Sequence, residues 1–226
     1  MALLPGKRPK HEKISDPAAY AARDGKGAFQ VTAQWNPWGD AAAHYTTTSH
    51  FGQTGRTKWH NNCGPTAVSN LLCMYRAKYL GQKSGTELAR AMYADTARYG
   101  TSRLYFINST SPFHGTSDFR AGGFILHSFQ RLLGVTPKIR PRRLTPENAI
   151  ASLEAGAALY LMLLHHPEYG SHHLIGYGMK KLERPSTGEV RYFLQVADGH
   201  AAMPRYLDMA DFEKTLSIYY EVIFPV

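Results

Sequence analysis

Cys63 lies in the stretch NNCGPTAVSN (61–70), where its type and its position together suit nucleophilic chemistry. Pro65 is tolerated in the first turn of a helix because its missing N–H would have no partner there, so a helix is predicted to begin at or just behind Cys63. Unpaired amides and the helix dipole stabilise negative charge at such an end, which makes a thiol more acidic. The alternative is a small buried cysteine beside an ordinary helix start.

A thiolate nucleophile needs a base, and the base needs a group that orients it. Of the 11 histidines, His172 and His173 are the informative pair, because they open the apolar stretch SHHLIGYG. A second apolar stretch ends in QVADG, which contains Asp198. If the two stretches form a hairpin, the beginning of the first strand lies beside the end of the second. The pattern therefore predicts a His172–Asp198 pair across a hairpin, opposite a cysteine on a helix.

The elements that must position these residues follow from hydrophobic spacing and from helix-start signals. Helices are predicted over residues 64–80, 84–97, 117–133 and 145–156, and a short one over 206–216. Strands are predicted over 158–164, 174–182, 190–197 and 217–226, with the second and third forming the hairpin. Because helices come first and antiparallel strands second, the sequence indicates an α+β fold.

The 226 residues, of which 43% are hydrophobic, suit one domain with a tail. Residues 1–28 have no apolar periodicity and are predicted to be a flexible basic N-terminal arm. Residues 29–226 are predicted to form a single domain, in which 29–60 are irregular and held by aromatic side chains. Cys63 and Cys73 would lie ten residues apart on one helix, roughly 15 Å, which is too far for a disulfide.

The formal net charge of +9 comes largely from residues 7–13 and from a basic loop with Lys138, Arg140, Arg142 and Arg143. Such local groups are more often solvated than part of a nucleic-acid surface, and neither zinc-finger nor RNA-binding signatures occur, so we expect no nucleic-acid partner. The longest apolar run, 157–164, is far shorter than the roughly 20 residues of a membrane span. The first residues lack the order of a secretory signal, which favours a soluble, cytoplasmic protein, although a trimmed signal would look the same.

The motifs CGPTAVSNLL, HHLIGYG and YFLQVADG, in this order, resemble those of the papain-like cysteine peptidases. The resemblance is greatest to compact bacterial members, which include the domains that clip bacteriocin leader peptides, and it covers roughly Thr57 to Val226. It implies a papain-like fold, with the nucleophile helix packed on an antiparallel sheet, and hydrolysis of a peptide or other amide without a cofactor. It also implies that Cys63 is the nucleophile, His172 the general base and acid, and Asp198 the orienting group.

Two details of the resemblance stay open. The family usually carries a Gln about six residues before the cysteine as an oxyanion donor, whereas position 57 is Thr. Gln53, Asn61 and Asn62 are the other candidate donors. Side chains alternate between faces along a strand, so only one of the two adjacent histidines can face the thiol. The spacing to Gly178 favours His172 over His173.

Three other functions compete with a thiol hydrolase. An acyltransferase would use the same triad, since the shape of the pocket chooses the acceptor. A zinc site would use Cys63 and the histidines at 165, 166, 172 and 173, but the chain has no HExxH or CxxC spacing and adjacent histidines on a strand point apart. A non-catalytic binding domain with the same fold is compatible with the missing Gln. The sequence does not indicate an oligomeric state.

Overall fold

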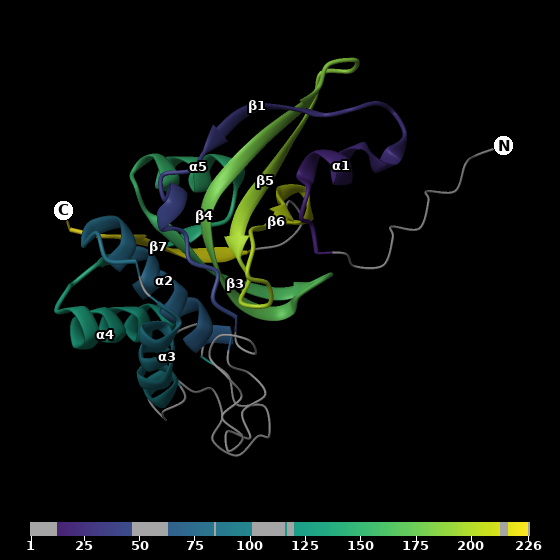
Figure 1. Cartoon of the computed structure of the whole chain (residues 1–226). Coiled ribbons are helices and arrows are strands. Elements are labelled where there is room, and N and C mark those ends of the chain that lie inside the picture. The colour runs from purple at the N-terminus through teal and green to yellow at the C-terminus, as the bar shows by residue number, and fades with distance from the viewer. Residues whose placement is uncertain are drawn as a thin grey trace.

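The computed structural model describes residues 13–46, 63–83, 85–100, 116, 120–212 and 217–225. One antiparallel sheet of seven strands organises this part of the chain, in the order β2-β7-β3-β4-β5-β6, with β1 paired to β4 outside this path. The strands are β1 (Gln30–Trp35), β2 (Lys138–Arg143), β3 (Ala158–His166), β4 (Gly170–Arg184), β5 (Glu189–Ala197), β6 (Arg205–Asp208) and β7 (Ile218–Ile223). The first part of the long strand β4 pairs with β3, and its second part pairs with β1 (Figure 1).

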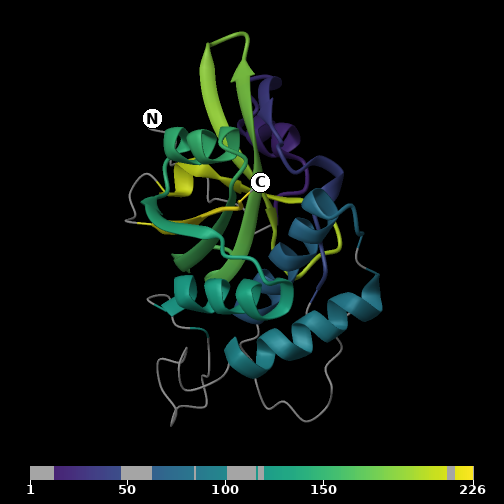
Figure 2. The same cartoon turned by 90° about the vertical axis from the view of Figure 1, so that its left-hand side faces the viewer.

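Helices cover both faces of this sheet. They are α1 (Pro17–Ala21), α2 (Cys63–Tyr79), α3 (Thr86–Gly100), α4 (Ala121–Leu133) and α5 (Pro146–Glu154), with 3₁₀ turns η1 (Ala22–Asp24), η2 (Gly39–Ala41) and η4 (Met209–Phe212). Figure 2 shows α5 on one side of the sheet and α3 and α4 on the other. The α+β class that the sequence indicates is confirmed. Among the described residues, no helix combines the length and the apolar character needed to cross a membrane.

Two hydrophobic cores lie on the two faces, because neighbouring side chains of a strand point in opposite directions. The core on the α2 face contains buried residues of α2, α3 and α4 together with sheet residues such as Tyr160, Met162, Ile175, Tyr177 and Ala197. The core on the α5 face contains Leu153 of α5 together with sheet residues such as Leu159, Leu161, Leu163, Leu174 and Val196. We call these the α2 face and the α5 face.

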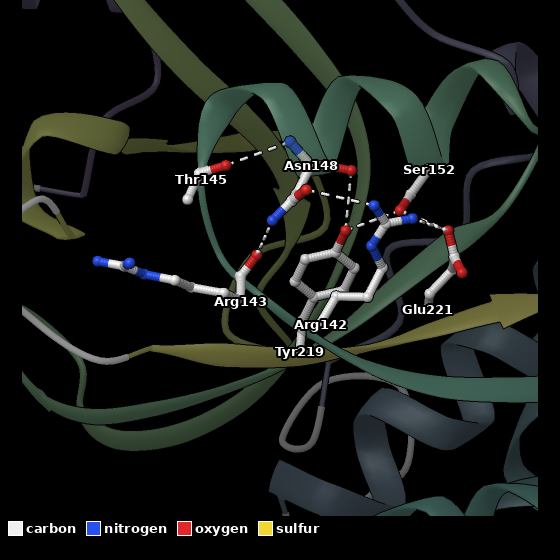
Figure 3. Close-up of polar contacts among 7 residues, drawn as sticks. All are labelled: Arg142, Arg143, Thr145, Asn148, Ser152, Tyr219 and Glu221. Atoms are coloured by element: carbon white, nitrogen blue, oxygen red, sulfur yellow. Dashed lines mark hydrogen bonds and ion pairs between the residues drawn. The ribbon is translucent and has the colours of Figure 1, made fainter.

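A polar network fastens α5 to strands β2 and β7 (Figure 3). The helix begins with Thr145 as its cap, followed by Pro146 at the first helical position, as the sequence predicts. Farther along, the buried Ser152 hydroxyl lies 2.7 Å from both the Tyr219 hydroxyl and a Glu221 carboxylate oxygen. Arg142 of β2 donates to the same carboxylate oxygen at 3.0 Å. Side chains from three elements are thus joined beneath one helix.

The N-terminal arm differs from its prediction. Ile14, Pro17 and Ala21 are buried, whereas residues 23–28 are exposed and residues 1–12 lie outside the described residues. Ile14 forms a β-bridge with Tyr206, and α1 follows it. Ile14 and Ala21 join a third hydrophobic cluster with residues of β4, β5 and β6. Arg184, which is 1% exposed, pairs with Asp24 at 2.7 Å, so charge and apolar contacts both fix this segment.

The remaining element predictions are mostly confirmed. The helix behind the cysteine, the three helices after it, the hairpin and the last strand are present, with bounds shifted by a few residues. The helix predicted over 206–216 is wrong: Arg205–Asp208 is a strand and a 3₁₀ turn follows. The basic loop is wrong as well, because Lys138–Arg143 forms the edge strand β2. Charged residues and proline are typical of edge strands, where they discourage further pairing.

Candidate functional site

Cys63 is the first residue of α2, so the predicted position of the thiol at a helix start is confirmed. The cysteine is half-buried, while the residues from Gly64 to Tyr75 behind it are buried. Its thiol lies near α3: burial raises the pKa of Tyr93 to about 12, and the neighbouring Cys63 adds to the rise. Cys73 lies in the core on the α2 face, and neither cysteine forms a disulfide.

The hairpin of β4 and β5 brings His172 and Asp198 together, as predicted. The contact differs from the prediction, because His172 Nε2 lies 2.8 Å from the main-chain oxygen of Asp198 rather than from its carboxylate. A carbonyl oxygen can only accept, so Nε2 carries the proton and Nδ1 carries the lone pair. Burial, as the largest cause, lowers the pKa of His172 to about 4, which keeps this ring neutral near pH 7.

The Asp198 carboxylate, which is fully buried, is bonded to other groups. One oxygen accepts from the main-chain N–H groups of His200 and Ala201 at 2.9 and 3.0 Å. The other accepts from the Tyr169 hydroxyl at 3.1 Å and lies 3.8 Å from the Lys13 ammonium. Aspartate commonly bonds the main chain two residues on in a turn, and here that local turn uses the oxygen expected to orient the histidine.

His172 belongs to an aromatic group on the α5 side of its strand. Its ring stacks on Tyr169, with centroids 5.5 Å apart, and lies 4.6 Å from the His200 ring. Tyr169 is itself packed against the core on the α5 face. No sequence pattern indicates Tyr169 or His200 as neighbours of His172, because the turn between β3 and β4 brings Tyr169 to this ring and the turn after β5 brings His200.

His173 lies on the opposite side of the same strand, on the α2 face, and it is buried. Its Nδ1 lies 3.0 Å from the Tyr160 hydroxyl, and its Nε2 lies 3.2 Å from the main-chain oxygen of Thr116. The Thr116 carbonyl can only accept, so it fixes the proton on Nε2, and Tyr160 therefore donates to Nδ1. Burial, as the largest cause, lowers the pKa of His173 to about 4.

Two close approaches lie at the start of α2. A β-carbon on Gly64 would fall on the Thr116 hydroxyl, and one on Gly199, after β5, would lie 2.8 Å from the Thr66 side chain. Thr116 therefore touches both the residue after the thiol and the ring of His173. The structure thus places His173 on the side of the sheet that α2 covers, and it places His172 with Asp198 on the other side. This arrangement disagrees with the preference for His172.

The structure bears only in part on the other predicted ligands and donors. Gln53, Thr57, Asn61 and Asn62 lie outside the described residues. In the part of the chain that the structure describes, no three His, Cys, Asp or Glu side chains are arranged to hold a metal ion. His166 Nδ1 faces the main-chain N–H groups of Glu168 and Tyr169 at 3.2 and 3.4 Å, within its own turn.

Comparison of the chain with known proteins yields no match: no protein-family model, no curated protein and no solved structure is significantly similar to it. A function is therefore inferred from the chemistry of the residues themselves, their placement on the fold and the resemblance of the three motifs.

Proposed function

We propose that the chain is a thiol-dependent hydrolase of peptide or other amide bonds, with Cys63 as the nucleophile and His173 as the general base and acid. A papain-like fold is part of this proposal. The observation that carries it is the position of a half-buried cysteine as the first residue of a 17-residue helix, packed on the face of the sheet that carries His173. A helix start favours the thiolate, and the histidine has a defined tautomer.

In the proposed reaction, the hydrogen bond from the Tyr160 hydroxyl to Nδ1 of His173 first breaks. This nitrogen then takes the thiol proton. The sulfur of Cys63 attacks the amide carbonyl, and the bond between carbon and nitrogen breaks as His173 returns its proton to the leaving amine. Water then hydrolyses the thioester by the same route. The Thr116 carbonyl, rather than the Asp198 carboxylate, keeps the ring in its working tautomer. With an amine in place of water, the same steps give an acyltransferase.

A non-catalytic binding domain is the second candidate, and one observation favours it. Both ring nitrogens of His173 are engaged, with Tyr160 and Thr116, and a pKa of about 4 makes the ring a weak base. In this state the ring of His173 is a neutral imidazole near pH 7. In a catalytic domain, Nδ1 of His173 must exchange its contact with the Tyr160 hydroxyl for one with the thiol of Cys63. In a binding domain, the contact with Tyr160 stays in place.

The reactivity of Cys63 separates the two candidates. The variant Cys73→Ser leaves Cys63 as the sole cysteine, and its rate of alkylation by iodoacetamide is measured from pH 5 to pH 9, together with hydrolysis of a fluorogenic peptide library. We expect Cys63 to alkylate at least tenfold faster than free cysteine at pH 7, because the helix start lowers its pKa. We also expect Cys63→Ser to abolish hydrolysis. Alkylation at the rate of free cysteine, without hydrolysis, would identify a binding domain.

A further inference from the structure

Thr116 joins the two parts of the proposed site. Its main-chain oxygen accepts from His173 Nε2 at 3.2 Å, and its side chain is packed so closely on Gly64 that a β-carbon there would fall on its hydroxyl. Gly64 directly follows the nucleophile in the first turn of α2. One residue, distant in sequence from both, therefore contacts the base and the beginning of the nucleophile helix.

Within the part of the chain that the structure describes, the Thr116 hydroxyl has no hydrogen-bond partner, although the residue is only 5% exposed. Other buried threonine and serine hydroxyls on this fold are bonded: Ser69 and Ser128, for example, each donate to the carbonyl four residues earlier. A buried hydroxyl without a partner costs about 1–3 kcal/mol, so such a group in a folded protein calls for an explanation. The explanation that fits this place is an acceptor that arrives with the substrate.

The hydroxyl lies at the beginning of α2, where the first amide groups have no partner within the helix and negative charge is favoured. The tetrahedral intermediate of acyl transfer places an oxyanion near the amide of its nucleophile. The oxygen therefore meets the Cys63 N–H and needs a second donor, which the papain-like pattern would supply with a Gln where this chain has Thr57.

We propose that the Thr116 hydroxyl is this second donor, and hence a catalytic residue of the site. The inference rests on the proposed thiol chemistry. As the Cys63 sulfur forms its bond to the carbonyl carbon, the π pair of the carbonyl moves onto oxygen, and that oxygen accepts from Thr116 Oγ1–H and from the Cys63 N–H. The pair returns when the carbon–nitrogen bond breaks, and the amine leaves with the proton from His173. Thr116 keeps its own proton throughout.

The experiment compares two reactions of Cys63 in the full chain. Acylation by p-nitrophenyl acetate passes through an oxyanion, whereas alkylation by iodoacetamide does not. The readout is the ratio of the two rate constants in wild type, Thr116→Val and Thr116→Ser. Removing one oxyanion donor typically costs about 10²–10³ in kcat, and an activated ester needs less of this help. We therefore expect Thr116→Val to lower the ratio roughly tenfold or more and Thr116→Ser to keep it within threefold.

The control is Ser128→Ala, which removes a buried hydroxyl from α4 and should leave the ratio unchanged. Gly64→Ala should also lower the ratio, because its β-carbon displaces Thr116. An unchanged ratio in Thr116→Val overturns the proposal, and so does an equal loss of both rates, which would mean that the hydroxyl acts on the thiol or on folding. The ratio can be measured even if the wild type hydrolyses no amide, so a failure of the proposed function is seen separately in the peptide assay.

Discussion

His172 and His173 are neighbours in the chain and differ in almost every contact. His173 is buried on the α2 face between Tyr160 and Thr116. His172 lies on the other side, in an aromatic group with Tyr169 and His200. Both donate an Nε2 proton to a main-chain carbonyl and both have a pKa of about 4. In the proposed reaction, the face of the strand, rather than the chemistry of the ring, therefore decides which imidazole can serve the thiol.

Replacing each histidine by glutamine tests this comparison with the largest expected effect. We expect His173→Gln to lower kcat/KM for a peptide substrate by about 10²–10⁴, the usual range for losing a general base. His172→Gln should stay within about tenfold of wild type, since its contacts lie on the α5 side. Because both rings are largely enclosed, urea unfolding of each variant must accompany the kinetics. A larger loss in His172→Gln, with the fold intact, would restore His172 as the base.

Acid stability is the second test, because both rings are held neutral. Their pKa is about 4 when folded and about 6.5 when unfolded, with burial as the main cause. Between these values the unfolded chain binds more protons, so the free energy of unfolding falls as the pH drops from 6.5 to 4. Each ring accounts for roughly 2–3 kcal/mol of the loss. Urea midpoints at pH 7 and pH 4.5 should differ less in His173→Gln than in wild type.

The protonation of Glu168 changes the free energy of unfolding in the opposite direction, which gives a second measurement of the same pH dependence. Burial, as the largest cause, raises its pKa to about 7, so the folded state holds its proton in a range where the unfolded chain loses it. Its contribution to stability falls as the pH rises from about 4.5 to 7, which partly offsets the histidines. Glu168→Gln should therefore make the acid loss steeper. A smaller loss of stability in acid in that variant would contradict the raised pKa of Glu168.

Much of the fold follows from local signals in the sequence. Pro65 and Thr145 mark helix starts, and the turn after Arg184 marks the hairpin. Strands β1 and β2 were not predicted, because pairing with distant strands gives them their structure and the Lys, Arg and Pro residues of β2 have low strand propensity. The prediction of a helix over 206–216 is wrong for the same reason, since Tyr206 pairs with Gln195 of β5 and forms a β-bridge with Ile14.

The candidate site was predictable only in part. The thiol at a helix start and the nearness of His172 to Asp198 come from local patterns, and both are present. Which histidine faces α2 depends on how β4 is placed between the two cores, and no local pattern records that. The Asp198 carboxylate is bonded to Tyr169 and lies near Lys13, from segments far apart in the chain. Nothing in the residues around Thr116 indicates its contact with Gly64.

The polar network on the α5 face offers a third test, smaller in size. Ser152→Ala removes a hydroxyl bonded to both Tyr219 and Glu221, all of them buried. We expect the free energy of unfolding to fall by about 1–3 kcal/mol, the usual loss when buried polar partners are left unsatisfied. The rate of Cys63 alkylation at pH 7 should stay within twofold, because the network (Figure 3) joins α5 to β2 and β7, whereas α2 packs in the core on the other face. A large change in alkylation would show that the two faces are coupled.

Lys13 gives the smallest and most selective test of the two faces. Its ammonium lies 3.8 Å from the Asp198 carboxylate and 5.3 Å from the centre of the Tyr169 ring, and its charge contributes to the lowered pKa of His172 and of His200. Lys13→Met keeps the apolar stem and removes the charge, so the pKa of both rings should rise. His173 lies on the other face, where burial is the largest cause of its lowered pKa, followed by the charge of His172, so its titration should move much less than that of His172. Titration of the ring protons by NMR in wild type and in Lys13→Met measures all three rings at once. A shift at His173 as large as the one at His172 would mean that the sheet does not separate the two environments, and it would remove the reason for choosing His173 as the base.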